Sequence, residues 1–171
     1  RCSYHVTFCC RVVSQRVPGV KRILLLVPSY SYRTGAFIEA ARDLGVILTV
    51  GTDYRPVLSA EAESTVQIGL ASVEEDLAVI RARAASQPFD GVIGTDDATV
   101  LLAAHVGTAL GLPQNLPAAV EIATNKLLMR RALRDKQLPT PQFRYLNAAA
   151  DLEAVAAQIE YPCVLKPLSL A

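Results

Sequence analysis

The strongest constraint on the fold of this chain is an uninterrupted apolar run at residues 23–27, Ile-Leu-Leu-Leu-Val, which Pro28 ends. A run without polar alternation is typical of a strand buried on both faces, as in a parallel sheet covered by helices. Strand and helix patterns then alternate: a helix at 35–44, strands at 46–50 and 65–68, a helix from 72 to about 87, a strand at 89–94 and a helix at 98–110. The sequence therefore predicts an α/β fold with a Rossmann-like parallel sheet.

The doubly wound order of such sheets places the first and fourth strands side by side and opens a ligand crevice at their carboxyl ends. The loops after these strands supply our candidate substrate-binding residues: Ser31, Tyr32, Arg33, Asp96 and Asp97. Asp97 is also expected to cap the helix at 98–110. The turn after the first strand, PSYSYRTG, matches neither G-x-G-x-x-G nor G-x-x-x-x-G-K-[ST]. This mismatch argues against a nicotinamide dehydrogenase and a P-loop NTPase.

The charges of the chain nearly cancel, with 17 basic and 16 acidic side chains among 171 residues. A net charge of +1 gives no general attraction to nucleic acid or to an anionic membrane. The uncharged stretch at 98–120 is interrupted by Gly and Pro, and its apolar part is too short to span a bilayer. We expect a soluble, cytoplasmic protein that binds neither nucleic acid nor membrane, and a homodimer remains open.

The first 38 residues carry six basic and no acidic side chains, together with three of the four cysteines. We interpret residues 1–21 as an irregular or non-native leader. A transit peptide is less well supported, because the segment has no amphipathic helical repeat. A zinc site at Cys2, His5, Cys9 and Cys10 is disfavoured, because the spacing lacks the paired ligand motifs of structural zinc sites.

The pattern changes after Leu112. Residues 112–117 resemble a linker, and a basic helix is predicted at about 124–136. Strands are predicted at 142–146 and 161–167, with a helix between them that Asp151 caps and that runs to 159. Lys166 lies within the second of these strands. Cys163 in the same strand, and His105 in the apolar helix, are both expected to be core residues.

Two segments of this second half, NKLLMRRALRDKQLPTPQF and YPCVLKPLSLA, carry a family resemblance. A four-strand sheet, a basic helix, a Pro-x-Pro turn and a strand with an internal lysine follow one another as in the ATP-grasp superfamily, which the chain resembles. The likeness is greatest to the carboxylate-amine ligases, including the amino-acid ligase and biotin carboxylase-like groups. It covers about residues 22–171 and implies a pre-ATP-grasp domain at 22–112, followed by the beginning of a truncated ATP-grasp domain at 113–171.

The resemblance implies that Lys126, which opens the basic helix, and Lys166 contact the phosphates of ATP. It also implies a ligase that activates a small-molecule carboxylate as an acyl phosphate, which an amine then attacks. An ammonium on a flexible stem suits this role, because it can follow a phosphate as charge develops. Asn125 stands where the family more often has Asp, and both side chains can accept local hydrogen bonds.

The family's glycine-rich loop and its Mg ligands follow the second lysine strand, whereas the last glycine of this chain is Gly111. We therefore expect the Mg ligands downstream of Ala171, no metal ligands within the chain and no activity from this part alone, and we assign no catalytic residue. Two alternatives remain open. One is a non-catalytic α/β module that binds or senses a small carboxylate in the crevice. The other is a doubly wound sugar-nucleotide transferase, which would not need Lys166.

Overall fold

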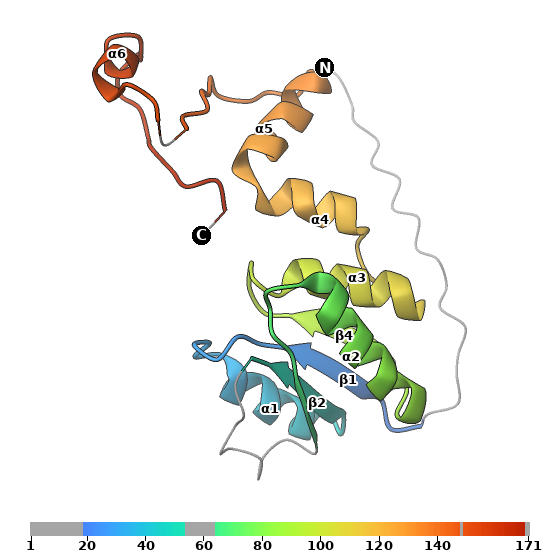
Figure 1. Cartoon of the computed structure of the whole chain (residues 1–171). Helices are drawn as coiled ribbons and strands as arrows, with labels where there is room; N and C mark the ends of the chain where they lie inside the picture. The colour runs from blue at the N-terminus through green and yellow to red at the C-terminus, as the bar shows by residue number, and fades with distance from the viewer. Residues whose placement is uncertain (1–18, 54–63, 148, 170–171) are drawn as a thin grey trace.

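A computed structural model describes residues 19–53, 64–147 and 149–169. The candidate zinc residues at positions 2, 5, 9 and 10 lie outside these ranges. The described sheet contains strands β1 (Arg22–Leu26), β2 (Ile47–Thr52), β3 (Ser64–Gln67) and β4 (Gly91–Gly94). Their order is β3-β2-β1-β4 and every pairing is parallel (Figure 1). The predicted neighbours, the first and fourth strands, do pair, and the α/β fold is confirmed.

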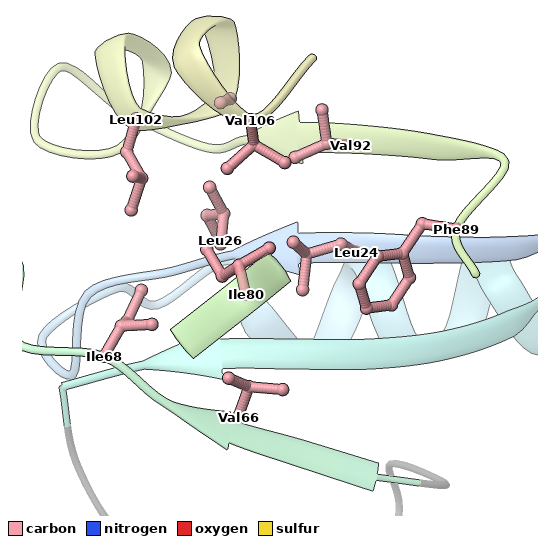
Figure 2. Packing of buried hydrophobic residues seen from close by; sticks show 10 residues of the cluster. Leu24, Leu26, Val66, Ile68, Ile80, Phe89, Val92, Leu102 and Val106 are labelled. Carbon is pink, nitrogen blue, oxygen red and sulfur yellow. The ribbon is translucent and has the colours of Figure 1, made fainter. Parts of the chain in front are cut away.

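Helices cover both faces of the sheet, as the apolar run of β1 requires. On one face, α1 (Thr34–Asp43) packs through Ala41 against Leu25 and Val27. On the other face, α2 (Val73–Ser86) and α3 (Val100–Leu110) enclose Leu24 and Leu26 (Figure 2). Three consecutive leucines of β1 are thus fully buried, alternately against the two layers of helices.

The start of α2 is fixed by two acceptors in its first turn. The Ser72 hydroxyl accepts a hydrogen bond from the Glu75 amide at 3.3 Å, as expected of a capping serine. Asp76 is buried, and its carboxylate accepts from the amides of Gly69 at 2.6 Å and Leu70 at 2.8 Å. This carboxylate therefore ties the loop after β3 to the helix, at a place where Leu70 has a positive φ of 58°.

The second half of the described chain consists of α4 (Pro117–Thr124), α5 (Lys126–Asp135) and the short α6 (Leu152–Ala156). Helix α4 packs against α3, which covers the sheet, and α5 packs against α4. Helices α4 and α5 therefore lead away from the sheet in succession (Figure 1). Within α4 and α5, both fully described, no residue is buried. We call α4 and α5 together the helix arm.

Several details of the second half differ from the sequence predictions. Helix α4 was not predicted, and the helix capped by Asp151 ends at Ala156 instead of 159. Residues 142–146 and 161–167 form no strand, because a strand needs hydrogen bonds to a neighbouring strand and the described residues supply none there. Consequently Cys163, expected in the core, is exposed. His105 on α3, also expected in the core, is only half-buried.

Candidate functional site

The substrate crevice was predicted at the carboxyl ends of the strands, where β1, β2 and β4 end. The Ser29 amide donates to Asp53 Oδ1 at 2.6 Å, and the Ser29 hydroxyl donates to Asp53 Oδ2 at 3.2 Å. On the other side of β1, the Thr95 amide donates to the Leu26 carbonyl at 3.3 Å. The loops after three neighbouring strands are therefore tied together. The Ser29–Asp53 pair was not predicted, although Asp53 directly follows a strand, because only the pairing of β1 with β2 brings the two residues together.

Three of the candidate residues lie in the loop after β1. Ser31 participates in a turn, in which its carbonyl accepts from the Thr34 hydroxyl at 3.3 Å. Tyr32 is 88% exposed, and the Arg33 guanidinium lies 5.6 Å from the centre of its ring. Interaction with the Tyr32 side chain raises the pKa of Arg33, and the Asp96 carboxylate adds to the rise. The loop thus carries an exposed cation and an exposed ring side by side, and the Arg33 charge is permanent.

The two aspartates after β4 have different environments. Asp96 Oδ1 accepts a hydrogen bond from the Ala98 amide at 3.1 Å. The backbone carbonyl of Asp96 accepts from the amides of Thr99 and Val100, at 3.0 Å each. The prediction that Asp97 caps the helix is wrong, since α3 begins at Val100 and Asp97 is exposed. The fully buried Thr99 hydroxyl accepts from the Thr95 amide at 2.9 Å and holds the loop from within.

A second candidate site lies at the amino-terminal end of α5. Asn125 Oδ1 accepts from the amides of Leu127 at 3.0 Å and Leu128 at 3.1 Å. The Asn125 carbonyl accepts from the Met129 amide at 2.9 Å. The remaining amide of this turn, that of Lys126, donates to the Leu168 carbonyl at 2.9 Å. The four first-turn amides therefore all have acceptors, so an anion here would be contacted by side chains.

The hydrogen bond between Lys126 and Leu168 joins the two segments in which the lysines were predicted. Lys126 is half-buried at the start of α5, and Lys166 is exposed two positions before Leu168. The first turn of α5 reads Lys-Leu-Leu-Met and contains no acidic side chain. The helix dipole and the Lys126 ammonium thus both favour negative charge at this end. That the two lysines contact phosphate remains a prediction.

A hollow of about 220 Å³ lies at the joint between the sheet and the helix arm. Its lining comes from β4, α3, the segment at 112–116 and α4, and contains no charged side chain: Val92, Ile93, Gly94, Val100, Ala103, Gln114, Asn115 and Val120. Gln114 Nε2 donates to the Val92 carbonyl across this joint at 3.0 Å. The predicted domain boundary near residue 112 coincides with the joint and stays a prediction.

Among residues 19–53, 64–147 and 149–169, no group of three or more His, Cys, Asp or Glu side chains could hold a metal ion. None of the helices in these ranges is long and apolar enough to cross a membrane.

Comparison with known proteins confirms the resemblance stated from the sequence. Residues 38–114 match the family model of the ATP-grasp N-terminal domain. Over 158 residues, the chain is 23% identical to the protein y4rH of Sinorhizobium fredii, an alignment that covers 91% of this chain and 33% of that protein. The chain therefore spans about a third of the length of this curated relative.

Solved structures show the same fold. The chain is similar to L-amino acid ligase from Bacillus licheniformis, with a TM-score of 0.69, 22% identity, and coverage of 90% of this chain and 38% of that one. It is also similar to phosphoribosylglycinamide synthetase from Anaerococcus prevotii, with a TM-score of 0.63, 16% identity, and coverage of 84% and 36%. For N5-carboxyaminoimidazole synthetase from Staphylococcus aureus complexed with ADP, the TM-score is 0.62 at 12% identity, with coverage of 88% and 39%.

Proposed function

Taking an ATP-grasp N-terminal domain at residues 38–114 as the premise, we propose that this chain is the front part of an ATP-dependent carboxylate-amine ligase. In the proposed reaction a substrate carboxylate receives a phosphoryl group and becomes an acyl phosphate. An amine then attacks the acyl carbon, which releases phosphate and forms an amide. Residues 22–112 would present the substrate crevice, and 113–171 would begin the ATP-binding domain.

The observation that carries the proposal is the hydrogen bond from the Lys126 amide to the Leu168 carbonyl. It fixes the segment that contains Lys166 at the end of α5 where Lys126 lies, although the two segments are far apart in the sequence. An anion bound at this end of α5 would be favoured by the helix dipole and would lie between the two segments that carry the lysines. A polyphosphate supplies that anion, and lysine is a common ligand for phosphate.

The residues present fit ATP but do not fit Mg²⁺. ATP, when bound, supplies the phosphoryl group, and Lys126 and Lys166 would hold its phosphates. Mg²⁺ needs several oxygen ligands, and the described residues hold no cluster of carboxylates able to provide them. We therefore assign no step to a metal bound by these residues.

In this proposal the crevice binds the carboxylate substrate. The exposed Arg33 is a permanent cation, and its guanidinium can donate two parallel hydrogen bonds to a carboxylate. Tyr32 lies beside it and offers a ring face to the apolar part of the same substrate. The Ser29–Asp53 pair would act indirectly, by holding the loop that presents both side chains.

The test is substitution of each lysine in the full-length protein. Lys126→Ala and Lys166→Ala should each weaken ATP binding by about 10-fold or more, because each removes a charge-assisted contact worth roughly 1.5–3 kcal/mol. Lys136→Ala is the matched control, since Lys136 is an exposed lysine at the opposite end of α5. ATP affinity by calorimetry and turnover by phosphate release are the measurements, with circular dichroism to verify folding. Unchanged ATP affinity and turnover in Lys166→Ala would refute the role of that lysine.

A further inference from the structure

We propose that Gln114 is a positioning residue, which fixes the helix arm, and with it Lys126, relative to the carboxyl end of β4. The functional part of this inference rests on the proposed ligase. Helix α5 packs on α4, and α4 packs on α3 (Figure 1). The segment at 112–116 connects α3 to α4, so its conformation sets the direction of the arm.

Gln114 makes a direct polar link from this segment to the sheet. Its Nε2 donates to the Val92 carbonyl of β4 at 3.0 Å, and its Oε1 accepts from the Asn115 amide at 3.0 Å. Both polar atoms of the side chain are thus engaged, one by the sheet and one by the segment itself. Two residues beyond Val92, β4 ends at Gly94 and leads into the loop of Asp96, which belongs to the proposed substrate crevice.

The backbone around Gln114 is shaped to hold it in place. A Cβ added at Gly107 of α3 would lie 2.7 Å from Gln114 Cγ and still closer to Gln114 Cβ. The Leu112 amide donates to the Gly107 carbonyl at 2.8 Å, which brings the segment back over the end of α3. Gly107 therefore provides the space that Gln114 occupies, and any larger residue there would displace it.

The hollow beside Gln114 explains why one hydrogen bond matters here. A hollow of about 220 Å³ lies between β4 and Val120 of α4, so on this side the Gln114 hydrogen bond, not close side-chain packing, connects the arm segment to β4. A link that bridges an incompletely packed joint restricts its motion more than the same link would in a dense core. We infer that loss of the Gln114 link allows the arm to change its angle to the sheet.

The first measurement is amide hydrogen exchange on this chain. Gln114→Met keeps the length of the side chain and removes its donor, and Gly107→Ala displaces the side chain while keeping its amide. Both should speed exchange in α4 and α5 about fivefold, as expected from loss of one hydrogen bond, and leave β1 and β2 unchanged. Asn115→Ala, which removes an exposed amide side chain from the next position, should leave exchange unchanged both in the arm and in the sheet. Unchanged exchange in the arm of Gln114→Met would overturn the proposal.

The second measurement is turnover in the full-length protein. A misplaced Lys126 should lower kcat of Gln114→Met about tenfold and leave the KM for ATP within about twofold, because phosphate binding persists while its alignment with the crevice is lost. Faster exchange in the arm with unchanged kcat would overturn the positioning role. Absence of ATP turnover in the unmodified protein would instead refute the proposed ligase, and the exchange experiment would still decide whether Gln114 fixes the arm.

Discussion

The sheet and the helix arm differ in how they are stabilised. The sheet encloses its own core, in which Leu24, Leu26 and Ile80 have no exposed surface. The arm has no buried residue, and its apolar side chains are half-buried or, like Ile122, exposed; beyond it Val164 and Leu165 are 79% and 82% exposed. The sheet is thus held by an enclosed apolar core, whereas the arm is held by the packing of α4 on α3, by helix caps and by single hydrogen bonds. The predicted phosphate site lies in the region without buried residues.

The largest effect expected is from Ile80→Ala. Ile80 on α2 is fully buried in the cluster of Figure 2, and its truncation should destabilise the protein by about 3 kcal/mol through lost contacts and a residual cavity. Leu133→Ala removes a half-buried side chain from α5 and should cost about 1 kcal/mol or less. Urea unfolding followed by circular dichroism measures both. Equal losses for the two variants would show that the arm has a core comparable to that of the sheet.

Asp76→Ala should have the next largest effect. The substitution removes a buried carboxylate and leaves the amides of Gly69 and Leu70 without their acceptor, which should cost about 2 kcal/mol. Glu75→Ala is the control, because the Glu75 side chain is exposed in the same turn of α2. Denaturant midpoints of the two variants give the comparison. A midpoint of Asp76→Ala equal to that of the control would mean that the loop after β3 does not need this carboxylate.

Asn125→Ala tests the arm itself. Loss of the side-chain acceptor for Leu127 and Leu128 should destabilise α5 by about 1 kcal/mol, whereas Asn125→Asp keeps the acceptor and should have little effect. Amide exchange in the first turn of α5, relative to that in β1, reports the local change. If β1 also exchanged faster in Asn125→Ala, the sheet and the arm would unfold as one unit.

The smallest effect is expected in the extended segment near Lys166. Val164→Ser and Leu165→Ser remove exposed apolar surface and should each change stability by less than about 0.5 kcal/mol. Thermal unfolding of this chain is a sufficient measurement. A loss of about 2 kcal/mol in either variant would indicate that the segment packs against something in solution.

The sheet could be predicted from the sequence because its signals are local. The apolar run of β1 identifies a buried strand, and the serine before α2 identifies a helix start, each from a few consecutive residues. Helix α4 was missed because Pro113 and Pro117 were taken as breakers, whereas Pro117 occupies the first turn of a helix, where its missing amide costs nothing. A proline indicates an interruption only when the helix would have to continue through it.

The candidate site was only partly predictable, for a different reason. Lys126 and Lys166 were chosen by resemblance, and their segments meet through the bond to Leu168, which no sequence pattern specifies. Residues 161–167 have the composition of a strand, but strand formation depends on a partner, and the described chain has none beside them. Asp53 and Gln114 were missed because each forms its hydrogen bond with a residue distant in the sequence, Ser29 and Val92 respectively.

Asn125 also limits how this protein can vary in length. It is both the residue that ends α4 and the residue that caps α5, so the two helices share a single joining residue. Because this joining residue is extended, with φ −103° and ψ 112°, one residue inserted or deleted here would change both the direction and the rotation of α5 relative to α4. Either change would move Lys126 away from the segment it contacts, so insertions and deletions should be poorly tolerated at this position.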